Sequence, residues 1–101
     1  MLISKESQET RSRILDFEKR IEEMHLSFQK YCQGVESRMP DYERLESDLI
    51  FFSRRKIFDL ELSKKLDRIL YKFQTRKRIW VRWVEDFQRG VHEKVLEPKS
   101  P

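Results

Sequence analysis

The side chains that could do acid–base, nucleophilic or metal chemistry form no recognisable site in this sequence, because the 18 Asp and Glu lack an apolar context that would raise a carboxyl pKa. His25 and His92 are the only histidines, and neither has a second ligand at the spacing of a metal site. Cys32 is the single cysteine, which cannot form a disulfide within the chain or a zinc site alone. Two glycines are too few for a phosphate-binding loop. The residues therefore predict no enzyme, no cofactor and no metal.

The most distinctive segment runs from Lys72 to Trp83, where cations alternate with large aromatic side chains. In a first interpretation the aromatic side chains are buried in a helical bundle, while the basic stems lie along its edge with their charges in water. Tryptophan and arginine are also common at the energetic centres of protein interfaces. We therefore predict that this segment contributes to a surface that binds another protein.

Two other interpretations of the same segment stay open. Cations can contact phosphates while tryptophans stack on unpaired bases, which would make the chain a nucleic-acid-binding helical protein. A basic amphipathic helix with bulky anchors is also what a calmodulin-type partner binds, and Phe73-Gln74 followed by Arg78 partly resembles an IQ motif, with Ile79 where that motif has glycine. The cations assigned to nucleic-acid or other anion contacts are Arg54, Arg55, Lys56, Arg76, Lys77, Arg78 and Arg82.

Composition favours helices as the elements that carry these residues. Of the 101 residues, 40% are charged and 38% are hydrophobic, and there are 2 glycines and 3 prolines. Sheets and loop-rich folds need more turn residues, whereas elongated helices with one apolar stripe suit this balance. No window holds the ~18 uncharged apolar residues of a membrane span. We predict one all-α domain over residues 1–101, with no membrane partner.

The first predicted helix covers residues 4–36. Its apolar residues alternate by three and four positions and fill the a and d positions of successive heptads, a pattern typical of a coiled coil. Gly34 and Pro40 favour a turn at residues 36–40, because glycine ends helices and proline disfavours helical geometry in the residue before it. The a and d residues are Ile14, Phe17, Ile21, Met24, Phe28, Tyr31 and Val35.

A second, longer helix is predicted over residues 41–97, before a polar tail at residues 98–101. A short connection usually brings consecutive helices together antiparallel. The expected fold is therefore an antiparallel helical hairpin or coiled coil, with a short first helix and a long second one, that assembles into a bundle. Because Ser53-Arg54-Arg55-Lys56 interrupts the apolar stripe, a break near Ser53 or Ser63 is the alternative.

The two predicted helices differ in reach. At ~1.5 Å per residue, the second helix would span roughly 85 Å and the first only about 50 Å. The last third of the second helix would then have no cover within the chain, and large exposed apolar surfaces mark interfaces. The predicted partner interface comprises Phe73, Ile79, Trp80, Trp83, Val84, Phe87 and Val91.

Charge is distributed unevenly along the chain. Residues 1–50 carry eight Lys and Arg against eleven Asp and Glu, whereas residues 51–101 carry fourteen against seven. An acidic first helix that pairs with a basic second one explains this difference without a ligand, and an anionic partner of the basic half is the alternative. We predict a non-enzymatic scaffold module that joins copies of itself, or another helical subunit, into a larger complex. The lone cysteine favours a reducing intracellular compartment, cytoplasm or nucleus.

Overall fold

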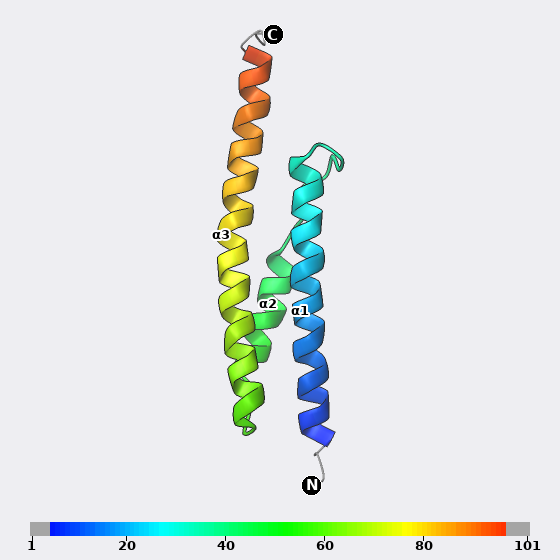
Figure 1. Ribbon diagram of the computed structural model, residues 1–101, viewed down its shortest axis with the longest axis vertical. Helices are drawn as coiled ribbons and strands as arrows, with labels where there is room; N and C mark the ends of the chain where they lie inside the picture. Colours follow the sequence, from blue (N-terminus) through cyan, green and yellow to red (C-terminus); the bar gives the residue numbers. More distant parts are fainter. Residues whose placement is uncertain (1–4, 97–101) are drawn as a thin grey trace.

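A computed structural model of the chain describes the backbone of residues 5–96 and the side chains of residues 5–90. Three helices make up this part: α1 (Lys5–Cys32), α2 (Glu43–Ser53) and α3 (Leu60–Leu96), as Figure 1 shows. The predicted all-α class is confirmed over these residues, which contain no strand. None of the three helices has an apolar run long enough to cross a membrane. The predicted tail at residues 98–101, and the helix ends at positions 4 and 97, lie outside the described residues.

The prediction of a single helix over residues 41–97 is wrong, because the chain leaves helical geometry between Ser53 and Leu60. Asp59 fixes the start of the new helix: its carboxylate accepts a hydrogen bond from the amide of Leu62 over 3.1 Å and caps the first turn of α3. The alternative of a break in this region is therefore correct. The cap is supplied by an aspartate that lies seven residues from both Phe52 and Leu66, so a continuous helix would have placed it on their apolar face.

α1 and α3 run parallel and side by side (Figure 1). Their side chains meet at a nearly constant sequence separation, which only a parallel pair can maintain. The separations are 54 residues for Glu22 and Arg76, 55 for His25 and Trp80, and 57 for Tyr31 and Gln88.

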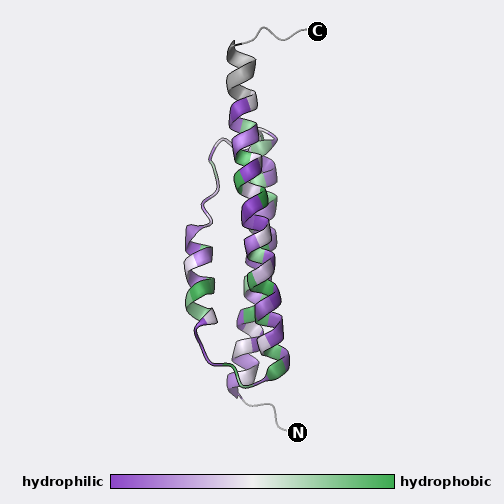
Figure 2. Cartoon of the chain, turned by 90° about the vertical axis from the view of Figure 1, so that its left-hand side faces the viewer, coloured by the Kyte–Doolittle hydropathy of each residue, from purple (hydrophilic) through white to green (hydrophobic). Residues whose placement is uncertain are grey.

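α2 runs antiparallel to the other two helices and covers one side of the α1–α3 pair (Figure 2). Phe17 of α1 packs on Phe52 near the end of α2, whereas the later Phe28 packs on Tyr42, which precedes α2. The expected two-helix hairpin does not form. Because the chain reverses at residues 33–42 and again at residues 54–59, its third helix returns alongside the first.

The first helix ends at Cys32 and not at position 36 as predicted, because Gly34, the glycine that the sequence marked as a helix stop, ends it earlier. The φ of Gly34, +79°, is in the left-handed region that favours glycine. The amide of Gly34 bonds to the carbonyl of Tyr31 over 3.0 Å, and the amide of Val35 bonds to that of Lys30 over 2.9 Å. This pair of bonds is a Schellman motif, which satisfies carbonyls that the helix end would otherwise leave unpaired.

One apolar core runs between the three helices, and the a and d positions predicted for the first helix largely belong to it. Tyr31 and Val35 are the exceptions: Tyr31 is half-buried beside the core, and Val35 is 67% exposed because it follows the helix stop at Gly34. The buried apolar side chains are Ile14, Phe17, Ile21 and Phe28 of α1, Leu45, Leu49 and Phe52 of α2, and Leu62, Leu66, Ile69, Phe73 and Trp80 of α3.

Candidate functional site

Trp80 lies at the centre of an aromatic cluster, and its side chain is 0% exposed. The indole stacks on Phe28 of α1, with ring centroids 5.0 Å apart and planes at 10°. It meets Phe73 of α3 edge-on at 6.0 Å, and Tyr42 lies 6.1 Å away. Such arrangements stabilise aromatic pairs beyond the burial of their area. The cluster therefore joins α1, the start of α2 and α3 at one point.

His25 holds the polar edge of the same indole. The Nε1–H of Trp80 donates a hydrogen bond to Nδ1 of His25 over 3.0 Å. Burial lowers the pKa of His25 below its ordinary value of 6.5, the nearby Arg76 guanidinium lowers it further, and Glu22 opposes the shift. An indole nitrogen can only donate, so Nδ1 must be unprotonated to accept this bond. The structure thus requires neutral His25, with its proton on Nε2.

The expectation that the last third of the predicted second helix has no internal cover is wrong for Trp80, which is 0% exposed, and Phe73 of the predicted interface is also buried, at 1% exposed. Because α1 runs parallel to α3, the C-terminal half of α1 reaches this third and covers it. The prediction had compared the lengths of two antiparallel helices and had assumed that the second one is continuous from residue 41. Of the other predicted interface residues, the side chain of Val91 lies outside the described residues, and four are half-buried: Ile79, Trp83, Val84 and Phe87.

Two of the predicted anion-contacting cations are committed to carboxylates of the chain itself. Arg76 donates through Nη2 to Glu22 over 3.1 Å, and Lys77 donates to Glu46 over 2.6 Å. The hydrogen bond to Glu46 raises the pKa of Lys77. Lys72 also pairs with Glu22, whose pKa is lowered chiefly by that hydrogen bond. The predicted pairing of an acidic first helix with a basic second one is therefore observed at Glu22, whereas Lys77 and Glu46 both belong to the stretch predicted as the second helix.

The remaining cations of that set do not form one surface. Arg54, Arg55 and Lys56 are exposed between α2 and α3, whereas Arg78 and Arg82 are exposed near the middle of α3. About 18 helical residues separate Leu60, at the start of α3, from Arg78. At ~1.5 Å per helical residue this is a distance of about 27 Å. Trp80 is also unavailable for stacking on bases. In the segment from Lys72 to Trp83, Arg78 and Arg82 are therefore exposed, whereas Trp80 is buried and Trp83 is half-buried.

Three large apolar side chains are exposed around the connection from α2 to α3, and we call them the α2–α3 corner. Phe51 is 73% exposed, Phe58 is 82% exposed and Leu60 is 69% exposed. The ammonium of Lys56 lies 5.4 Å from the centroid of the Phe58 ring. The prediction did not include these residues, because a continuous helix would have distributed them over its faces. Recognition of the Asp59 cap would have placed Phe58 in a loop.

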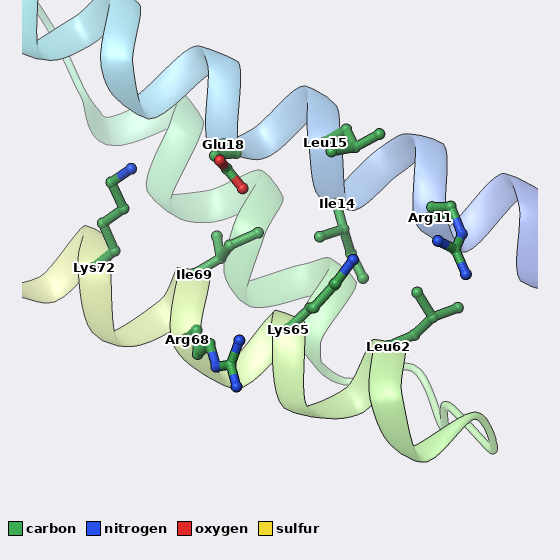
Figure 3. A pocket seen from close by; sticks show the side chains of 9 residues that line it. All are labelled: Arg11, Ile14, Leu15, Glu18, Leu62, Lys65, Arg68, Ile69 and Lys72. Atoms are coloured by element: carbon green, nitrogen blue, oxygen red, sulfur yellow. The ribbon is translucent and has the colours of Figure 1, made fainter.

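A groove between α1 and α3 lies on the side away from α2 (Figure 3). One depression in it, of about 270 Å³, has an aliphatic floor and several cationic side chains around it. A second depression of about 460 Å³ lies further along the same pair of helices. The first is lined by Arg11, Ile14, Leu15 and Glu18 of α1 and by Leu62, Lys65, Arg68, Ile69 and Lys72 of α3.

Within residues 5–90, no three His, Cys, Asp or Glu side chains are placed to hold a metal ion. Cys32 is half-buried, and burial raises the pKa of its thiol, which makes the reactive thiolate scarcer at neutral pH.

Comparisons of the chain with protein-family models, curated proteins and solved structures find no match.

Proposed function

We propose that this chain is a non-enzymatic interaction module that binds another protein chain, a second copy or a different helical subunit, within an intracellular assembly. The observation that carries the proposal is the exposure of the α2–α3 corner, where Phe51, Phe58 and Leu60 are all at least 69% exposed. A large apolar side chain gains about 1.5–3 kcal/mol when it is fully buried. Exposed apolar groups gathered at one connection are typical of a binding surface.

The charges around this corner support a protein partner that has acidic residues at its rim. Arg54, Arg55 and Lys56 are exposed in the same connection, and no ion pair joins them to another residue of the described part of the chain. Cations around an apolar centre speed association and fix orientation more than they add affinity. An apolar centre with a polar rim is also the usual anatomy of protein interfaces.

Nucleic-acid binding, the alternative from the sequence, has weaker support. Arg76 and Lys77 are paired with carboxylates, and Trp80 is buried. A calmodulin-type partner would have to draw Phe73 and Trp80 out of the core before it could use them as anchors. The exposed surface offers apolar groups at the corner without any such rearrangement.

The test replaces the corner by serine in a triple variant, Phe51→Ser with Phe58→Ser and Leu60→Ser. The matched control is Tyr71→Ser with Val81→Ser, which removes exposed apolar groups from α3 away from the corner. Mass in solution is measured by light scattering over a range of concentrations, and cross-linked partners from the native cell are identified by mass spectrometry.

We expect the wild type and the control to form the same complex, and the corner variant to remain monomeric and partner-free while it keeps its helical circular dichroism. Equal complex formation by the corner variant would contradict the proposed surface. A wild-type monomer that cross-links to no protein but binds labelled oligonucleotides at ~50 mM salt, where phosphate contacts are strong, would favour the alternative function.

A further inference from the structure

The groove between α1 and α3 has an uneven balance of charge. Arg11, Lys65, Arg68 and Lys72 line its first depression together with a single carboxylate, Glu18 (Figure 3). Lys72 is paired with Glu22. The other three cations have no ion-pair partner within residues 5–90. Most charge in this depression is therefore not neutralised by the chain itself.

Apolar side chains continue along the same side of the molecule. Leu15 and Leu26 of α1 are 58% and 55% exposed, and three helical turns between them keep both on one face. Further along, Trp83 and Phe87 line the second depression together with Gln29, Cys32, Gln33 and Asp86. The α1–α3 pair thus presents a row of apolar side chains, and cations flank this row at the N-terminal end of the two helices.

The dimensions of the groove suit a helix better than a small molecule. Small-molecule sites usually have volumes of about 300–1,000 Å³ and enclose most of the ligand, whereas the charged depression is about 270 Å³ and open along the helices. The first depression is lined from α1 by residues between Arg11 and Glu18, and the second by Gln29, Cys32 and Gln33, so the two together extend from position 11 to position 33. That stretch spans roughly 33 Å, which a helix of about 22 residues would cover.

We propose that this groove binds an acidic amphipathic helix of a partner protein, which completes a four-helix bundle on the side that α2 leaves open. The proposal rests on the proposed function and names the chemistry of one partner. The apolar face of the helix would lie on Leu15, Leu26 and Trp83, and its carboxylates would meet Arg11, Lys65 and Arg68. A second copy docked parallel through the same groove would oppose identical cations, and one docked antiparallel would set them against a depression with a single carboxylate, Asp86, so charge favours a different, acidic chain.

The test uses the full chain and two synthetic peptides of about 22 residues, with leucine at the a and d positions of successive heptads. One peptide has glutamate at its e and g positions, and the other has lysine there. Binding is measured by calorimetry, and the binding surface is mapped by backbone amide chemical shifts of the labelled protein. Single-stranded oligonucleotide and inorganic phosphate are titrated separately at the same salt concentration.

We expect the acidic peptide to bind, with shifts confined to the α1–α3 groove, and the basic peptide not to bind. Lys65→Glu with Arg68→Glu should weaken binding about tenfold or more, because it places like charges against the peptide. Arg78→Glu with Arg82→Glu changes the net charge by the same amount on exposed positions outside the depression and should change affinity much less.

The proposal would be overturned by equal effects of the two charge-reversed variants, by equal binding of both peptides, or by the absence of any shift in the groove with the acidic peptide at ~1 mM. Stronger shifts of Lys65 and Arg68 with oligonucleotide or phosphate would assign the groove to phosphate groups instead. These outcomes do not depend on the α2–α3 corner. A corner variant that stays monomeric but still binds the peptide would support both proposals separately.

Discussion

The indole N–H of Trp80 and the Nδ1 atom of His25 are joined by a hydrogen bond of 3.0 Å between residues 55 apart in the chain. This bond links α3 to α1 at the aromatic cluster. Trp83 also lies against the His25 ring, with centroids 5.0 Å apart. The imidazole is thus in contact with both tryptophans, and one of them requires its unprotonated nitrogen.

Stability should fall as the pH is lowered through the range in which histidine titrates. Because the pKa of His25 is lower in the folded chain than its ordinary 6.5, the unfolded chain binds more protons below about pH 6.5. The contribution of neutral His25 is therefore complete above 6.5 and is lost as the pH falls through the lower folded pKa. Urea unfolding followed by circular dichroism between pH 7.5 and 5, a range chosen around the ordinary histidine value, measures this slope.

His25→Asn is the matched variant for that slope, because an amide oxygen can accept from the indole but does not titrate. We expect the variant to lose most of the decrease in stability between pH 7 and 5, whereas His92→Asn should retain it. An unchanged slope in the His25 variant would show that the imidazole is not held neutral by this contact.

Trp80→Ala should cost about 3–5 kcal/mol of unfolding free energy, because it removes the largest fully buried side chain from the cluster. A loss of that size is a large part of the total stability of a small domain. Trp80→Phe should cost less, since it keeps an aromatic ring and loses the donor to His25. Trp83→Ala, at a half-buried position, is the comparison. Equal losses for the two alanine variants in urea unfolding would contradict the central placement of Trp80.

Glu22→Gln should reduce stability by roughly 0.2–1 kcal/mol at low salt, because it removes the carboxylate shared by Lys72 and Arg76. The estimate is small because 45% of the Glu22 side chain is exposed and solvent screens the charges. The difference from wild type should shrink at high salt. Glu23→Gln, whose pairing with Lys19 is at 3.9 Å on an open surface, should have little effect. A salt-independent loss would mean that packing, not charge, is affected.

Asp59→Ala should reduce stability by about 0.5–2 kcal/mol, because it removes the side chain that caps α3. Asp59→Asn should keep most of the stability that Asp59→Ala loses, since asparagine caps helices equally well. Asp67→Ala removes an exposed carboxylate from within α3 and controls for the change in charge. If asparagine failed to restore stability while Asp67→Ala had the same effect as Asp59→Ala, the cap would be refuted and a general charge effect indicated.

Local patterns in the sequence predict helices well because their causes are local. The heptads of the first helix correctly identify Ile14, Phe17, Ile21 and Phe28 as core residues. Gly34 correctly marks the helix stop, since its left-handed conformation is a property of that residue alone. The charge difference between the two halves also anticipates the pairing of Glu22 with Lys72.

The arrangement of the helices was not predictable in the same way, because it depends on one ambiguous residue. A continuous helix would place Asp59 on the apolar face, between Phe52 and Leu66, but aspartate also suits a helix cap. The two alternatives differ little locally, yet one produces two helices and the other three. The direction of the last helix, the cover over Trp80 and the exposure of Phe58 all follow from that choice.

The parallel alignment of α1 and α3 has a consequence for how the chain folds. An antiparallel hairpin can grow outward from its turn, but each contact between α1 and α3 closes a loop of about 55 residues. Rates of folding fall as contacting residues become more distant along the chain. During synthesis, Phe28 therefore has no stacking partner until residue 80 has left the ribosome. Tyr42 and α2 can contact Phe28 and Phe17 earlier, but the part of the first helix that faces α3 stays uncovered over that interval.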